Sequence, residues 1–123
     1  METYAIHKNA DLKPRQARLT LDLVRGKSVE AARGILVNTN TKASRMILKV
    51  LNSAAANAVN NNKAKESDLV ISECFINPGP VRKKIKFASR SRIGRRDHRT
   101  SHIIVKVSDN KENKIIKKVK EAK

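Results

Sequence analysis

Residues 69–107 read LVISECFINPGPVRKKIKFASRSRIGRRDHRTSHIIVKV, and this stretch decides the fold. Residues 69–77 are rich in strand formers, and residues 103–107 alternate with a period of two. These two segments are predicted to pair as strands. The residues between them show no apolar periodicity and begin with Pro78-Gly79-Pro80, which we interpret as a rigid bend. If residues 80–102 continue both strands, the whole stretch forms one long β-hairpin.

The middle of this hairpin is strongly basic. Each arm would have about a dozen residues and reach roughly 40 Å, whereas a domain of about 100 residues has a radius of gyration of about 13 Å. Ile85, Phe87 and Ile93 are its only bulky apolar residues, so it cannot build a core of its own. We expect it to stand clear of the domain, mobile alone and ordered by a partner. Its basic residues, opposed only by Asp97, are Arg82, Lys83, Lys84, Lys86, Arg90, Arg92, Arg95, Arg96 and Arg99.

The charge of the whole chain points to a polyanionic partner. Lysine and arginine number 28 against 11 acids in 123 residues, a formal charge of +17. Each phosphate that a cation neutralises releases counterions, so binding to nucleic acid should depend strongly on salt. Arginine, which dominates the hairpin cations, binds phosphate oxygens in pairs and stacks on bases, and this favours folded RNA over lipid. A merely solvated basic loop is the alternative, but such loops are rarely this long without acids.

Membrane binding and secretion are both disfavoured. The aromatic residues are only Tyr4, Phe75 and Phe87, too few for a typical membrane-surface helix. No stretch approaches the roughly 20 apolar residues that cross a bilayer, and the first ten residues lack the apolar run of a secretory signal, so we expect an intracellular protein. Cys74 is the single cysteine and is expected to be a buried, reduced thiol.

Catalytic and metal-binding functions lack a supporting pattern. His7, His98 and His102 are isolated, no cysteine and histidine have ligand spacing, and the acids are scattered singly. No glycine-rich phosphate loop follows a strand. The sequence therefore predicts no enzyme activity, no metal site and no cofactor, and favours a structural or RNA-contacting role for each histidine.

The residues before the hairpin predict an edge strand over 3–8 and three helices. Pro14 suits the first turn of a helix that Gly26 would end in the left-handed conformation. Ser28 should cap a second helix over about 29–37. A third, amphipathic helix is expected from Thr41 to about Asn60, with residues 60–62 leading into a loop.

The predicted fold is therefore α+β: three helices packed on a small antiparallel sheet, with a long protruding β-hairpin. One domain is expected over residues 1–108, including the basic hairpin at about 80–102. Residues 109–123 form a basic C-terminal tail whose apolar residues have helical spacing, so it is either a short amphipathic helix or a frayed end.

Basic residues near the ends of the first predicted helix form a candidate second RNA contact. A solvated helix face is the alternative explanation of the same charges. The residues are Lys13, Arg15, Arg18, Arg25 and Lys27.

Several strings in the chain resemble the family of the bacterial large-subunit ribosomal protein L twenty-two. They are PRQARL at 14–19, LVRGKSVEAA at 23–32, LKVLNSAAANA at 48–58, NPGP at 77–80 and RTSHI at 99–103. They occur in order, and the resemblance covers about residues 4–108.

The resemblance implies a small α+β domain that binds large-subunit rRNA and sends a long β-hairpin along the wall of the nascent-peptide exit tunnel. The implied partners are large-subunit rRNA, neighbouring large-subunit proteins and the nascent peptide, in the cytoplasmic ribosome. Carried over by position, the start of the first helix at Pro14, Arg15 and Arg18, the hairpin cations and the segment Arg99, Thr100, Ser101 and His102 would contact rRNA.

The hairpin tip would face the tunnel. Its residues are Ala88, Ser89, Arg90, Ser91, Arg92, Ile93 and Gly94. The spacing from Pro80 to His102 matches the family, so the hairpin should keep its length. The tip residues depart from the family's usual Pro-Arg-Ala-x-Gly-Arg, so the turn should differ, and Gly94 is the only glycine near it.

Three other functions remain as alternatives. A DNA-binding architectural module would bend duplex DNA, but the sequence has no clear recognition helix. A cationic membrane-active protein would bind vesicles. A nucleic-acid-modifying enzyme would need a catalytic constellation that the sequence lacks.

Overall fold

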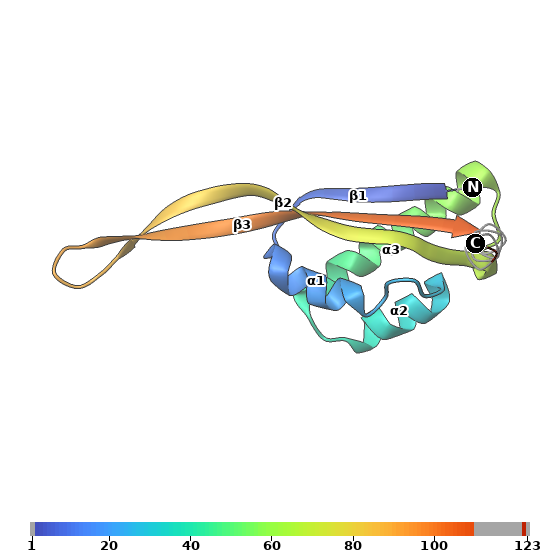
Figure 1. The fold of residues 1–123 in the computed structure, drawn as a ribbon, viewed down its shortest axis with the longest axis horizontal. Coiled ribbons are helices and arrows are strands. Elements are labelled where there is room, and N and C mark those ends of the chain that lie inside the picture. Colours follow the sequence, from blue (N-terminus) through green and yellow to red (C-terminus); the bar gives the residue numbers. More distant parts are fainter. Residues whose placement is uncertain (1, 110–121, 123) are drawn as a thin grey trace.

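The computed structural model describes residues 2–109 and 122, and these form three helices packed on a three-stranded sheet (Figure 1). The predicted α+β class is confirmed. The C-terminal tail predicted over 109–123 lies outside the described residues, apart from Asp109 and Ala122. The elements are β1 (Glu2–Ala10), α1 (Pro14–Asp22), α2 (Val29–Asn38), α3 (Lys42–Asn62), a 3-10 turn (Glu66–Asp68), β2 (Leu69–Phe87) and β3 (Ile93–Asp109).

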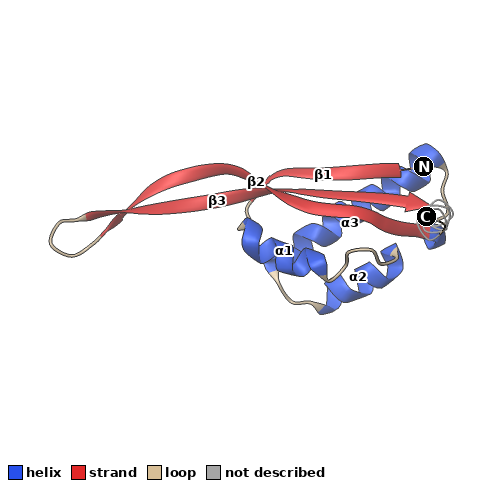
Figure 2. Ribbon diagram, viewed as in Figure 1, coloured by secondary structure: helices blue, strands red, loops and turns tan. Residues whose placement is uncertain are grey.

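The sheet has the strand order β1-β3-β2, and both pairings are antiparallel. The predicted edge strand is present and longer than the sequence indicated. It pairs with β3 from Glu2 opposite Ser108 to His7 opposite Ile103, and an irregularity precedes the last pair, Ala10 with Ser101. Figure 2 shows the helices gathered beside one half of the sheet, while β2 and β3 continue without them.

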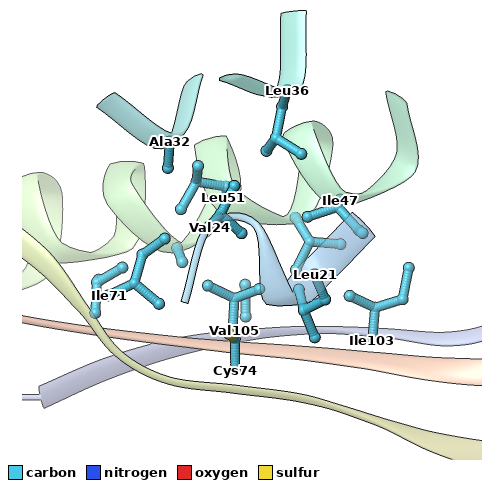
Figure 3. Packing of buried hydrophobic residues seen from close by; sticks show 14 of the residues in the cluster. Leu21, Val24, Ala32, Leu36, Ile47, Leu51, Ile71, Cys74, Ile103 and Val105 are labelled. Carbon is cyan, nitrogen blue, oxygen red and sulfur yellow. The ribbon is translucent and has the colours of Figure 1, made fainter. Parts of the chain in front are cut away.

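One hydrophobic core lies between the sheet and the helices. Leu21 of α1, Ile47 and Leu51 of α3, and Ile103 and Val105 of β3 are at most 1% exposed and point toward one another (Figure 3). The small residues of α3, Ala54, Ala55 and Ala58, are also buried in this core. Cys74 is buried as predicted, and burial raises the pKa of its thiol.

Local capping explains where the helices begin and end. The Ser28 hydroxyl accepts a hydrogen bond from the Ala31 amide, as predicted, and Thr41 and Ser44 form a reciprocal capping box for α3. Gly26 has the predicted left-handed conformation, φ +74°, but α1 itself ends at Asp22, before a turn. The expected loop at residues 60–62 was wrong: α3 continues through them to Asn62, and its C-cap, Lys63, is left-handed at φ 52°.

The long hairpin predicted from residues 69–107 is confirmed. β2 and β3 pair from Leu69 opposite Asp109 to Phe87 opposite Ile93, and beyond the helices they form an arm (Figure 1). The Pro78-Gly79-Pro80 segment, interpreted as a bend, lies within β2 as a bulge. Between Pro78 and Val81 the register shifts, which places one extra residue on β2.

Candidate nucleic-acid interface

Strand pairing sorts the side chains of the arm onto two faces. Residues directly opposite each other in an antiparallel pair project to the same side of the sheet. Arg82 lies opposite His98, Lys84 opposite Arg96, and Lys86 opposite Gly94. We call the surface formed by Arg82, Lys84, Lys86 and Arg96 the cationic face. All four side chains are exposed, and within the described residues none of them forms an ion pair.

The other side of the arm, the mixed face, combines apolar and charged side chains. Ile85, Phe87 and Ile93 are 65%, 84% and 66% exposed. Asp97 accepts a hydrogen bond of 2.8 Å from Arg95 and thereby raises the pKa of that guanidinium. This face therefore carries a local acid that partly offsets its cations. The members are Val81, Lys83, Ile85, Phe87, Ile93, Arg95, Asp97 and Arg99.

The tip of the arm is a tight turn between Ala88 and Arg92. The Ala88 amide donates to the Arg92 carbonyl at 2.8 Å. Arg90 and Ser91, the central residues, both have positive φ, 59° and 57°. Gly94, the glycine noted near the tip, lies outside the turn and pairs with Lys86 in the strands. Positive φ at both central residues is typical of a type I′ hairpin turn, and here neither of these residues is glycine.

A cluster of polar side chains, Asp11, Lys42 and His98, connects the base of the arm to the domain. The Asp11 carboxylate contacts Lys42 Nζ at 3.0 Å and His98 Nε2 at 2.6 Å. Both contacts lower the pKa of the Asp11 carboxyl, and the contact with Lys42 has the larger effect. Sequence reasoning missed this cluster, because residues 87 positions apart give no local signal of contact.

The basic residues in and around α1 have different surroundings. Lys13 and Arg15 are exposed. Arg18 instead donates to the Ile76 carbonyl at 3.0 Å, which ties α1 to β2, and Arg25 forms an ion pair with Asp22. Lys27 is exposed, and its carbonyl accepts from the Ile71 amide.

A cavity joins the first of these residues to the base of the arm. Its volume is about 550 Å³, its floor includes Leu12 and Ala43, and Lys13, Lys42 and Arg99 also line it. Lys13, at the start of α1, and Arg99, at the base of the arm, therefore line the same cavity.

The segment 100–102, expected to contact RNA, is largely internal. Thr100 is 3% exposed and its hydroxyl donates to the Pro80 carbonyl at 2.7 Å, while Ser101 is fully buried. His102 is half-buried, and its Nδ1 accepts from the Asn9 amide at 3.0 Å. Because buried side chains offer RNA no surface, we exclude Thr100 and Ser101 from the interface proposed below.

The described part of the chain has neither a candidate metal site nor a candidate membrane-spanning helix. Residues 2–109 and 122 contain no group of three or more potential metal ligands close enough to share an ion. Among the same residues, no helix is long and apolar enough to cross a membrane.

Comparison with known proteins identifies the family. The family described as ribosomal protein L22p/L17e matches residues 5–108. The chain is 44% identical over 112 residues to the large ribosomal subunit protein uL22 of Halothermothrix orenii, and 46% identical over 112 residues to that of Desulforamulus reducens. Each match covers 91% of this chain and 99% of the relative. A third relative, uL22 of Fusobacterium nucleatum, is 49% identical over 109 residues, which are 89% of this chain and 98% of the relative. These matches confirm the resemblance seen in the sequence, and the chain belongs to the L22p/L17e family of ribosomal proteins.

Proposed function

We propose an rRNA-binding role for this chain, which is a structural, non-enzymatic protein of the large subunit of the cytoplasmic ribosome. In this proposal it binds and crosslinks segments of large-subunit rRNA during assembly, and its hairpin lines the nascent-peptide exit tunnel. The observation that carries the proposal is the cationic face, where four exposed basic side chains gather on one side of an arm that has no core of its own.

The geometry of this face suits a phosphate backbone. Arg82, Lys84 and Lys86 alternate along β2, so they span about 13 Å in one row. Arg96 lies beside this row on β3, opposite Lys84. Such a strip neutralises several phosphates without reading bases, so its affinity should fall steeply with salt. Ordering an isolated hairpin is unfavourable in water, and RNA contacts would offset that cost.

The rest of the proposed rRNA surface extends from the arm to the domain. It includes cations on both faces and at the tip, since RNA can surround a thin hairpin on several sides. His102 is only half-buried, so part of its side chain is accessible for such a contact. These further residues are Lys13, Arg15, Arg18, Arg25, Lys27, Lys83, Arg90, Arg92, Arg95, Arg99 and His102.

The two faces of the arm allow a matched experiment. One variant, Lys84→Gln/Lys86→Gln/Arg96→Gln, removes three charges from the cationic face, and the control, Lys83→Gln/Arg95→Gln/Arg99→Gln, removes three from the mixed face. Binding of each purified chain to large-subunit rRNA is measured over a range of salt concentrations. The slope of log affinity against log salt should fall by about 2–3 for the first variant and by a smaller amount, about 1–2, for the control, because Asp97 already offsets the charge of Arg95.

The same pair of variants tests assembly. Both should unfold thermally like the parent chain, because the replaced side chains lie outside the core. The cationic-face variant should enter large subunits less efficiently than the control. Equal salt slopes and equal incorporation would contradict the proposal.

The opposite orientation of the two faces supports the proposed position in the tunnel. If the cationic face lies on rRNA, the tip at residues 88–94 and the apolar part of the mixed face are left to line the tunnel. A photoreactive residue replacing Phe87 should then react with a nascent peptide in stalled ribosomes, while one replacing Lys84 should react with rRNA. Reaction of both positions with rRNA alone would exclude the tunnel placement of this face.

Crosslinking in growing cells would identify the RNA. The RNA attached to residues 82–99 should derive from several separate regions of large-subunit rRNA around the exit tunnel. Crosslinks scattered over messenger RNA or DNA would instead support a general nucleic-acid-binding module.

A further inference from the structure

The side of the sheet opposite the helices has an apolar surface that is not part of the arm. In the part of the chain that the structure describes, the buried strand residues, such as Ile71, Val105 and Ile103, face the helices. The alternate residues project to the opposite side. There, Ile6 of β1 lies opposite Ile104 of β3, which lies opposite Phe75 of β2. A row of apolar side chains thus crosses all three strands.

This row and the neighbouring Tyr4, which we call the open face, are accessible to solvent. Tyr4 is 61% exposed, Ile6 46% and Phe75 36%, and Ile104 is half-buried. Scattered exposed apolar residues are normal, but a contiguous group of them commonly marks an interaction site. Tyrosine and phenylalanine are also enriched among residues that anchor protein interfaces.

The charges around the open face differ from those of the arm. Glu73 forms an ion pair of 2.7 Å with Lys106, and this hydrogen bond raises the pKa of that lysine. Glu2 accepts a hydrogen bond from Ser72 at 2.8 Å. The acids Glu2 and Glu73 are thus matched by Lys106 and Lys8, in a chain whose formal charge is +17. This balanced charge gives phosphate groups no net attraction, so it favours a protein partner over RNA.

We propose that the open face is a docking surface for another protein of the same particle, one that presents apolar side chains to Tyr4, Ile6, Phe75 and Ile104. This inference rests on the proposed function, because it places the partner in the large ribosomal subunit. The partner covers the apolar row, and its polar rim meets the Glu73–Lys106 pair.

Photocrosslinking in purified large subunits tests the proposal. p-Benzoylphenylalanine is placed at Tyr4 in one variant and at Phe75 in another, with Val37 of α2, which is 68% exposed, as the control position. After irradiation and nuclease digestion, both test positions should yield an adduct with the same ribosomal protein, identified by its peptides. The Val37 position should not yield that adduct.

A second change tests whether apolar contact holds the partner. Ile6→Glu should lower the adduct yield from position 75 about tenfold, because a carboxylate would be buried in an apolar contact. Val37→Glu should leave the yield unchanged. Incorporation of each variant into subunits is measured in parallel.

The outcomes separate this inference from the proposed function. A variant that enters subunits but reacts with rRNA, only with its own chain, or not at all would overturn the docking surface and leave the ribosomal role intact. Failure of the unsubstituted chain to enter large subunits would overturn both.

Discussion

Replacing Gly79 with alanine should destabilise the junction between the domain and the arm. A Cβ added at this position would lie 2.7 Å from Thr100 Oγ1 and 3.3 Å from the Thr100 carbonyl carbon. The first distance is about 0.7 Å or more short of ordinary contact. Thr100 cannot easily move, because it is buried and its hydroxyl donates to the Pro80 carbonyl at 2.7 Å.

The magnitude follows from these contacts. Overpacking of this kind costs about 1–3 kcal/mol, and breaking the Thr100–Pro80 bond to relieve the clash would cost about as much. We therefore expect the free energy of unfolding to fall by about 2 kcal/mol, which corresponds to a lowering of Tm by roughly 4–12 °C. Urea denaturation followed by circular dichroism measures the change.

A double-mutant cycle and a control sharpen this test. In a Thr100→Ala background the closest obstructing atom is gone, so Gly79→Ala should cost at least about 1 kcal/mol less than in the parent. Gly34→Ala on α2, where an added Cβ meets nothing within 4 Å, should stabilise the chain by up to about 1 kcal/mol. A cost of Gly79→Ala below about 0.5 kcal/mol in both backgrounds would refute the close-approach argument.

Three further predictions concern the tip, the arm base and the core. The double change Arg90→Asn/Ser91→Gly should slow amide hydrogen exchange at the tip about tenfold, because these residues adopt positive φ at lower cost; unchanged protection would argue against the turn. Lys42 and His98 lower the pKa of Asp11 from its usual 3.8, so the stability that Asp11 contributes is full above pH 3.8 and is lost as the pH falls below it. The stability difference between the parent and Asp11→Asn, measured by urea denaturation, should thus shrink as the pH falls from about 5 to about 2; a constant difference would contradict the pairing. The Cys74 thiol should be alkylated at least about 100-fold more slowly in the folded chain than in urea, as followed by mass spectrometry, and rapid labelling of the native state would show that the core opens there.

Local patterns in the sequence predicted most of the elements. These patterns involve residues only a few positions apart, so they can be recognised without knowledge of the fold. They are the apolar spacing of α3, the Ser28 cap and the period-two alternation of the strands. The sequence-based prediction failed where the residue that ends an element has no characteristic sequence preference. The run 60–62 remains helical because Lys63, a residue with no special turn preference, takes the left-handed position that ends α3.

The sequence predicted which types of residue make up the candidate site, but not how these residues are arranged. The excess of arginine and lysine indicated an RNA-binding arm, and the structure gives these residues exposed positions. Sequence reasoning did not foresee that Arg18 would bond the Ile76 carbonyl or that Thr100 would be buried by the arm base. Both depend on contacts between segments distant in the chain.

The division of the arm into two faces depends on the bulge at Pro78-Gly79-Pro80. Before the bulge Pro78 lies opposite Ser101, and after it Val81 lies opposite Arg99. Without the extra residue, Arg82 would lie opposite Asp97 and Lys86 opposite Ile93, so cations would share each face with an acid or an apolar group.

The bulge moves every later residue of β2 to the other side of the sheet. It places Lys84 beside Arg96 and Phe87 beside Ile93, so one face carries no acid and no bulky apolar residue, while Asp97 and the apolar residues lie on the other with the remaining cations. Gly79 permits this because β3 approaches too closely for a side chain at that point. A feature one residue long, invisible to composition and periodicity, therefore gives an evenly basic sequence one face suited to phosphate and a second face that also presents apolar side chains.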